Sequence, residues 1–306
     1  MFKVLVSDKV DESGLKLLEE EGFYVERNFD ITHDELLEKI KDFDAIIVRS
    51  RTKVTKEVIE NGKKLKVIGR AGVGLDNIDV EEAKKRGIKV VNSPEGPTRA
   101  VAELVIALAF NLFRGINKGD SALKEGKWIK KQLVGRELEG KTLGIIGLGR
   151  IGRKVAKIAC ALGLNVLGTD IIKIQCEYAK FVSLEEVLRN ADIISIHVPL
   201  TDETRGLIGE KEFEQMKDGV VIINTSRGSI IDEKALYNAL QSGKVAGAGL
   251  DVFSEEPPQS DFLLNLINHP NVIATPHIGA NTKEALQKNS QIIARKIIET
   301  LKEQKQ

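Results

Sequence analysis

Short apolar runs alternate with amphipathic segments along the whole chain. Apolar residues recur with the helical period in segments such as Glu12–Glu21 and His33–Lys41. The runs between them predict the strands Lys3–Ser7, Ala45–Val48, Lys66–Gly69 and Lys89–Asn92 in the first third of the chain. This alternation predicts an α/β fold, in which helices cover both faces of a parallel sheet.

The segment Ser93-Pro94-Glu95-Gly96-Pro97 interrupts this rhythm. Two prolines and a glycine exclude regular structure there, so we expect a turn or a crossing between domains. The rhythm then resumes with a helix at Arg150–Ala161, a helix capped at Ser183, and a last helix from Thr282 to about Glu303, with Asn281 as its expected cap. The predicted strands of this part are Thr142–Ile146, Asn165–Thr169, Asp192–Ile196, Val220–Asn224, Val245–Asp251 and Val272–Ala274.

Composition narrows the class of protein. A chain of 306 residues is long enough for two domains, and 42% hydrophobic with 30% charged residues is typical of a globular protein. The net charge of +1 provides no field that favours nucleic acid or a membrane, so neither partner is expected. The first residues lack the apolar run of a signal peptide, and the two cysteines form no disulfide framework, which predicts a cytoplasmic location. The longest apolar run, Val101–Phe113, is too short to span a bilayer and is expected to be a buried or interface helix.

A dinucleotide site is predicted at Gly147-Leu148-Gly149-Arg150-Ile151-Gly152, between a strand and a helix. The first glycine permits a tight turn, the second lets a pyrophosphate approach, and the third lets helix pack on strand. Asp170 ends the next strand, 18 residues after Gly152, where a carboxylate suits ribose hydroxyls and repels a 2′-phosphate. We therefore expect NAD as cofactor; no metal is expected.

Three residues at the ends of later predicted strands suit the oxidation of a 2-hydroxy acid. Arg227 can hold a carboxylate, His277 can accept the hydroxyl proton, and Glu256 can stabilise the imidazolium that forms. Taken singly, each residue is better explained as a surface ion pair, a solvated loop or a packed loop. Together, behind a nucleotide motif, they favour catalysis. His197 is the alternative base, and we expect it beside the nicotinamide half of the cofactor in a structural role.

On these motifs the chain resembles the D-isomer-specific 2-hydroxyacid dehydrogenases. The matching segments are 48–54, 69–79, 147–152, 224–228, 249–257 and 276–280. The resemblance implies catalysis by Arg227, Glu256 and His277. It implies substrate contacts by Arg49, Ser50, Gly72, Val73 and Gly74. It implies cofactor contacts by Gly147, Gly149, Arg150, Ile151, Gly152, Asp170, His197, Val198, Pro199, Thr225, Ser226, Asp251, Gly279 and Ala280.

The resemblance also implies a flavodoxin-like substrate-binding domain of residues 1–96 and 282–306 and a Rossmann NAD-binding domain of residues 97–281. A homodimer through the Val101–Phe113 helix is expected. Three functions remain open: oxidation of 3-phosphoglycerate, reduction of glyoxylate, hydroxypyruvate or pyruvate, and NAD sensing as a corepressor with little turnover. An arginine cluster, Arg49, Arg51, Arg70 and Arg99 with Lys53, favours a phosphorylated substrate. Because the chain ends directly after the last helix, we expect no regulatory domain and no inhibition by serine.

Overall fold

The computed structural model describes residues 1–303. The chain divides into two compact units, which we call unit 1 (Met1–Pro97 and the segment from Ala280 onward) and unit 2 (Thr98–Gly279). The boundaries expected from the sequence lie within two residues of this division, and residues 304–306 of the expected substrate domain lie outside the described part.

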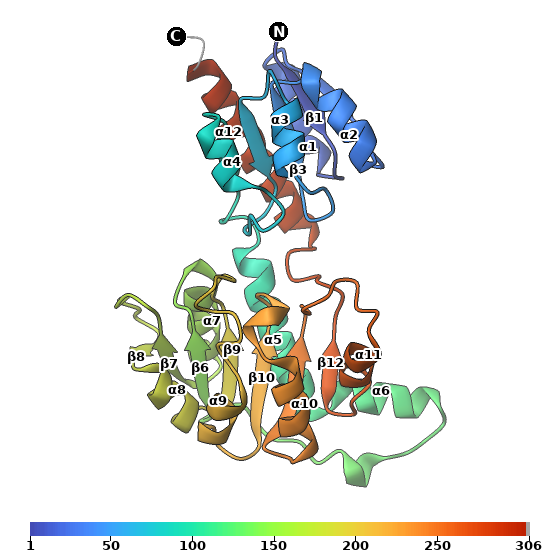
Figure 1. The fold of residues 1–306 in the computed structure, drawn as a ribbon. Helices are drawn as coiled ribbons and strands as arrows, with labels where there is room; N and C mark the ends of the chain where they lie inside the picture. The colour runs from blue at the N-terminus through green and yellow to red at the C-terminus, as the bar shows by residue number, and fades with distance from the viewer. Residues whose placement is uncertain (304–306) are drawn as a thin grey trace. The chain divides into compact units, whose positions relative to one another are not determined.

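Unit 1 is built on a parallel sheet of five strands in the order β2-β1-β3-β4-β5, the flavodoxin-like order (Figure 1). Its core has two parts. One packs the sheet against α1 and α12, and the other packs it beneath α2, α3 and α4. The strands are β1 (Lys3–Val6), β2 (Tyr24–Arg27), β3 (Ala45–Val48), β4 (Val67–Arg70) and β5 (Lys89–Asn92). The helices are α1 (Glu12–Glu20), α2 (His33–Lys39), α3 (Lys56–Asn61), α4 (Val80–Lys85) and α12 (Lys283–Glu303).

Unit 2 contains a parallel sheet of seven strands in the order β12-β11-β10-β9-β6-β7-β8 (Figure 1). From β6 the chain adds β7 and β8 on one side, and it then returns to add β9 to β12 on the other side of β6. This reversal of strand order between β6 and β9 is the Rossmann arrangement. The strands are β6 (Thr142–Ile146), β7 (Asn165–Thr169), β8 (Lys180–Phe181), β9 (Ile193–Ile196), β10 (Val220–Asn224), β11 (Val245–Leu250) and β12 (Val272–Ala274). The helices are α5 (Thr98–Arg114), α6 (Ile116–Lys124), α7 (Arg150–Ala161), α8 (Leu184–Asn190), α9 (Glu210–Gln215), α10 (Glu233–Gln241) and α11 (Asp261–Ile267).

The predicted fold class is confirmed: two α/β units, each with an all-parallel sheet. Two edge strands, β2 and β8, were missing from the prediction because they are short and partly exposed, so their residues carry no apolar run. The predicted cap at Asn281 is wrong. The hydroxyl of Thr282 accepts the N–H of Ala285 at 3.2 Å and caps α12 instead.

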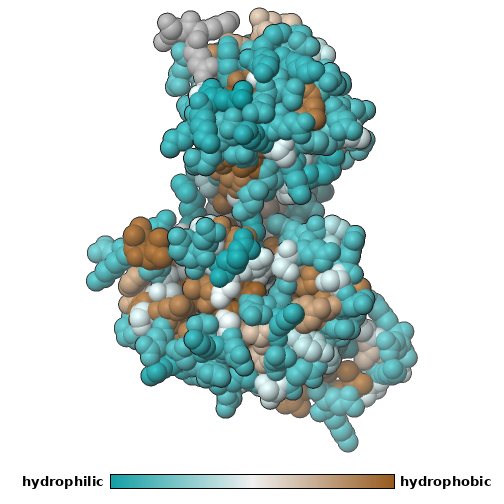
Figure 2. Space-filling model, viewed as in Figure 1, coloured by the Kyte–Doolittle hydropathy of each residue, from teal (hydrophilic) through white to brown (hydrophobic). Residues whose placement is uncertain are grey.

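The surface of each unit is mostly hydrophilic, with separate apolar patches (Figure 2). Within residues 1–303, no single helix is long and apolar enough to cross a bilayer. Helices α5 and α6 meet that test only as a pair, and the chain bends by 64° between them. The apolar run predicted at Val101–Phe113 lies in α5, where Val105 and Leu108 are buried in the core beside α7.

Candidate active site

The glycine motif forms the turn between β6 and α7 in unit 2. A Cβ on Gly147 (φ 100°) would lie 2.7 Å from the His197 backbone, and one on Gly152 would lie 2.0 Å from the Gly147 carbonyl oxygen. A Cβ on Gly149 would meet no atom within 4 Å. Gly149 also begins α7 without any side-chain cap. The turn thus leaves open space at the N-terminus of a helix, where backbone N–H groups suit a phosphate.

Asp170 directly follows β7 and faces this turn. Its Oδ2 accepts the backbone N–H of Leu148 at 2.8 Å, which fixes the carboxylate beside the glycine motif. The next side chains, Ile171 and Ile172, are 98% and 64% exposed. An acid at the end of this strand is suited to the ribose hydroxyls of NAD.

The loops after β9 and β10 meet at the same edge of the sheet. Ser226 donates from its hydroxyl to the Val198 carbonyl, and Thr204 donates to the Pro199 carbonyl at 2.6 Å. The hydroxyl oxygen of Thr225 is buried and has no hydrogen-bond partner within the described part of the chain. A buried hydroxyl of this kind fits a site that receives a polar ligand. Together with the open turn at Gly149, these residues fit a bound NAD.

His197 is held by a 2.8 Å contact between its Nε2 and the Ser195 hydroxyl. Burial lowers the pKa of His197 to about 4, so its imidazole is neutral and weakly basic at neutral pH. This makes His197 the poorer candidate for the base.

The three predicted catalytic residues follow three adjacent strands, β10, β11 and β12. His277 contacts Glu256 through Nδ1 and Oε2 at 2.7 Å, and Oε1 of Glu256 accepts the Phe253 N–H at 3.1 Å. Burial raises the pKa of Glu256, but the hydrogen bond and charge of His277, the Phe253 N–H and the Arg227 charge together lower it below its usual value. Glu256 is therefore a carboxylate at neutral pH, suited to orient and stabilise a protonated imidazole.

Arg227 belongs to the same group of residues. Its guanidinium donates to the Ser226 carbonyl at 2.7 Å, and its own carbonyl accepts from the Asn224 amide at 2.9 Å. The following Gly228 packs so closely on the loop after β11 that a Cβ there would lie 1.9 Å from the Phe253 carbonyl carbon. This contact fixes the arginine loop against the loop that carries Glu256.

Asp251 is 1% exposed and serves the loop that carries His277. Its carboxylate accepts the Thr275 hydroxyl at 2.6 Å and the N–H groups of Ile278 and Gly279, both at 2.8 Å. The sequence suggested a cofactor contact for Asp251 and gave no sign of this supporting role. Ala280, expected beside the cofactor, falls in unit 1.

In unit 1, the expected substrate residues follow the adjacent strands β3 and β4. Gly72 has a φ of 154°, a backbone conformation that favours glycine. Its carbonyl accepts the Ser93 N–H at 2.9 Å. The Asn92 amide donates to the Val73 carbonyl at 2.7 Å, so the loop Gly72–Gly74 is tied to β5. Ser50 is exposed and its hydroxyl accepts from Arg70 at 3.4 Å. Burial lowers the pKa of the Arg49 guanidinium, although the Asp8 charge opposes the shift.

The residues of the predicted arginine cluster come from both units. Arg99 lies in α5 of unit 2 and pairs with Glu103 at 2.6 Å. Arg51 pairs with Asp8 at 3.0 Å and donates to two backbone carbonyls. Among the residues described, no group of three or more His, Cys, Asp or Glu side chains is arranged to hold a metal.

Comparison with known proteins defines the class. Residues 106–279 match the family model "D-isomer specific 2-hydroxyacid dehydrogenase, NAD binding domain". The chain therefore belongs to the D-isomer-specific 2-hydroxyacid dehydrogenases, and unit 2 contains the family's NAD-binding domain.

Individual relatives agree with this assignment. The chain is 50% identical to D-3-phosphoglycerate dehydrogenase of Methanocaldococcus jannaschii over 99% of its own length, and it spans 58% of the length of that relative. It is 46% identical to hydroxypyruvate reductase of Thermotoga maritima over 98% of both chains. The solved TT0316 protein of Thermus thermophilus has a TM-score of 0.90 and 36% identity, covering 98% of this chain and 97% of that one.

Proposed function

We propose that this protein is an NAD-dependent dehydrogenase that interconverts 3-phospho-D-glycerate and 3-phosphohydroxypyruvate, the first step of serine biosynthesis. The contact of His277 with Glu256 at 2.7 Å carries the proposal, because it pairs a base with a carboxylate at the edge of a nucleotide-binding sheet. The name of the M. jannaschii relative supports the phosphorylated substrate.

In the proposed reaction, bound NAD supplies the hydride acceptor for the C2 hydrogen of the hydroxy acid. His277 accepts the hydroxyl proton as the C2 carbonyl forms, and it returns a proton in the reverse direction. Glu256 orients the imidazole through Nδ1, which leaves Nε2 for the substrate. Arg227 holds the carboxylate of the substrate, since a guanidinium matches its two oxygens.

The remaining site assignments are proposed on the same basis. Arg49, Ser50 and the backbone of Gly72–Gly74 contact the substrate, and the glycine motif, Asp170 and the loops after β9 and β10 contact NAD. Unit 1 is then the substrate-binding domain and unit 2 the NAD-binding domain.

A second function, hydroxypyruvate or glyoxylate reduction, is favoured by the T. maritima relative, which matches over 98% of both chains. It is also favoured by the engagement of Arg51 with Asp8, which removes one cation from the expected phosphate site. Steady-state assays that follow the absorbance of reduced nicotinamide separate the two functions. Higher kcat/KM with phosphohydroxypyruvate than with hydroxypyruvate, glyoxylate or pyruvate supports the first function, and the reverse order supports the second.

We further propose a homodimer and a cytoplasmic location. Two free cysteines, Cys160 and Cys176, suit a reducing compartment. One face of α5 packs within unit 2, and Phe110 of the same helix is 38% exposed. The proposed dimer surface therefore includes α5 and the segment that follows it. There, Ile116, Leu123, Trp128 and Val134 are 58%, 59%, 80% and 88% exposed. Exposed apolar residues gathered in one segment are typical of an interface.

A further inference from the structure

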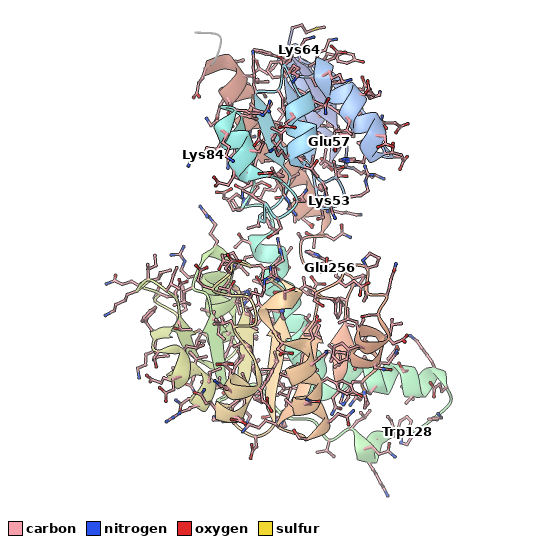
Figure 3. The ribbon with its side chains drawn as sticks, in the orientation of Figure 1. Lys53, Glu57, Lys64, Lys84, Trp128 and Glu256 are labelled. Carbon is pink, nitrogen blue, oxygen red and sulfur yellow. The ribbon has the colours of Figure 1, made fainter. Side chains whose placement is uncertain are left out.

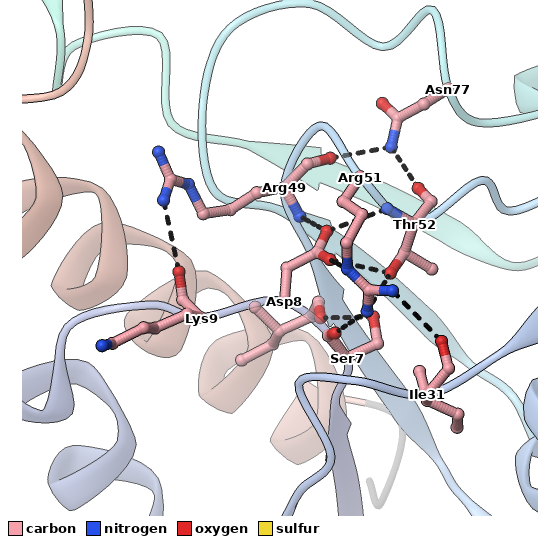
Figure 4. Close-up of polar contacts among 9 residues, drawn as sticks. Ser7, Asp8, Lys9, Ile31, Arg49, Arg51, Thr52 and Asn77 are labelled. Carbon is pink, nitrogen blue, oxygen red and sulfur yellow. Dashed lines mark hydrogen bonds and ion pairs between the residues drawn. The ribbon is translucent and has the colours of Figure 1, made fainter. Parts of the chain in front are cut away.

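Asp8 is a buried carboxylate that takes no part in the proposed chemistry. It follows β1, is 3% exposed, and lies beside the loop Arg49–Thr52 that follows the neighbouring strand β3 (Figure 4). One carboxylate oxygen accepts the backbone N–H groups of Arg49 and of Thr52, the latter at 3.2 Å. The other accepts the Thr52 hydroxyl at 2.8 Å and Nε of Arg51 at 3.0 Å. Asp8 thus engages donors of Arg49, Arg51 and Thr52, three of the four residues of the loop.

Asn77 engages the acceptors of the same loop. Its amide nitrogen donates to the carbonyl of Arg49 at 2.8 Å and to the carbonyl of Thr52 at 2.6 Å (Figure 4). The guanidinium of Arg51 adds hydrogen bonds to the carbonyls of Ile31 at 3.1 Å and Ser7 at 2.6 Å. Both ends of the four-residue loop are therefore fixed through backbone groups as well as side chains.

We propose that Asp8 and Asn77 are positioning residues that hold Arg49 and Ser50 in place to bind the anionic end of the substrate. The proposal rests on the proposed function. The bonds fall on the backbone at Arg49 and Thr52 and on the side chain of Arg51, while the hydroxyl of Ser50 stays at the surface. Arg51 is then a part of the support rather than a ligand of the substrate.

The test compares Asp8→Asn and Asn77→Ala with wild type in the full chain. Asparagine has one accepting oxygen in place of the two of the carboxylate, so donors on one side of Asp8 lose their acceptor. Alanine at position 77 leaves the carbonyls of Arg49 and Thr52 without the amide that donates to them. Because small misplacements of a binding group cost up to 10²-fold, we expect KM for phosphohydroxypyruvate to rise by about 10- to 100-fold. We expect kcat to change far less, and NADH affinity, followed by nicotinamide fluorescence, to stay unchanged. Unchanged KM in both variants overturns the proposal.

Asp11→Asn is the matched control. Asp11 follows the same strand and also accepts a backbone N–H, that of Ser13 at 2.9 Å, but it caps α1 rather than supporting the loop. Its KM should equal that of wild type, and an equal rise would mean that any lost carboxylate in this region disturbs unit 1. If Asp8→Asn does not fold, the half-buried Asn77 decides the question through Asn77→Ala.

A binding measurement separates this proposal from the proposed function. Calorimetry with 3-phospho-D-glycerate in the presence of NADH reports anion binding without turnover, because both molecules are already reduced. A wild type that binds 3-phosphoglycerate but reduces no 2-oxo acid contradicts the proposed function only, and weaker 3-phosphoglycerate binding by both variants still supports the positioning role. Equal 3-phosphoglycerate affinity in wild type and variants overturns that role. A wild type that neither binds 3-phosphoglycerate nor reduces any 2-oxo acid overturns both.

Discussion

At the scale of single residues, His277 combines a functional contact with an unusual backbone. Its Nδ1 lies 2.7 Å from Oε2 of Glu256, and its φ is 50°, in the left-handed region that residues other than glycine seldom adopt. The His277 N–H donates to the Asp251 carbonyl at 2.9 Å, and the Asp251 carboxylate holds the next two residues. A strained residue persists only where its surroundings hold it, and such residues gather at functional sites.

Replacement of His277 by alanine tests the base directly. We expect kcat to fall by about 10²- to 10⁴-fold, the range for loss of a general acid–base group, with NADH affinity nearly unchanged. His33→Ala is the control, because His33 is an exposed histidine in unit 1 that lies 3.8 Å from Glu57. A His277→Ala enzyme with wild-type kcat would exclude His277 as the base.

The role of Glu256 is tested by the pH dependence of Glu256→Gln. Because the folded pKa of Glu256 lies below 4.5, this carboxylate is ionised throughout an assay between pH about 5 and 9, and its own protonation matters only in more acidic solution. The glutamine leaves the imidazolium without its charged neighbour. The acid limb of the oxidation profile should therefore move to lower pH, and kcat should fall. Superimposable wild-type and variant profiles would contradict the assignment.

At the scale of elements, the site is built where strands end. β10, β11 and β12 are neighbours, so Arg227, Glu256 and His277 reach one edge of the sheet although the chain separates them. β6 and β9 are neighbours where the strand order reverses, which is where open α/β sheets bind ligands. The loops at this edge pack so closely that their backbones have little room to move, as the contact of Gly228 with Phe253 illustrates.

Gly149 provides the test at this scale. Gly149→Ala should fold with wild-type thermal stability, because the added Cβ meets no atom within 4 Å and φ is −66°. NADH binding should weaken by about tenfold or more, a loss of roughly 1.4 kcal/mol, because the methyl group fills space needed by the pyrophosphate. Gly209→Ala is the control, since Gly209 begins α9 in the same unit and its Cβ would have its nearest contact at 3.5 Å. Unchanged NADH affinity in Gly149→Ala would place the pyrophosphate elsewhere.

At the scale of the whole molecule, the segment after α5 stands out. Trp128 is 80% exposed, beyond the end of α6 (Figure 3). Lysines surround it in sequence at positions 127, 130 and 131, so the segment is both basic and apolar. A tryptophan is seldom left this exposed unless another surface covers it.

Trp128→Glu should therefore weaken the proposed dimer. We expect wild type to sediment as a dimer at micromolar concentration and the variant to shift toward monomer, because the substitution removes a large apolar contact and buries a carboxylate that must lose its hydration. Leu264→Glu is the matched control, since Leu264 is 41% exposed on α11, outside this segment. A wild type that sediments as a monomer would exclude the dimer itself, and an unaffected variant would exclude this surface.

Local sequence determined most of the elements of this protein. Strands β3, β6 and β10 have the bounds that their apolar runs predicted, because a strand buried on both faces is apolar along most of its length. The glycine motif and Asp170 were also recognisable from the sequence, because their roles depend on backbone conformation and on spacing along the chain. The edge strands β2 and β8 were not recognisable, since one-sided burial leaves polar residues within them.

Only the tertiary structure decided how distant residues are used. Asp8 and Arg49 are 41 positions apart, and no local pattern joins them, yet the pairing of β1 with β3 brings the carboxylate onto the loop. The same holds for Asp251, which supports residues 27 and 28 positions away, and for Arg51, which the sequence suggested as a ligand for phosphate. A side chain's partners depend on which strands lie side by side, and that order is a property of the folded sheet rather than of the sequence around each residue.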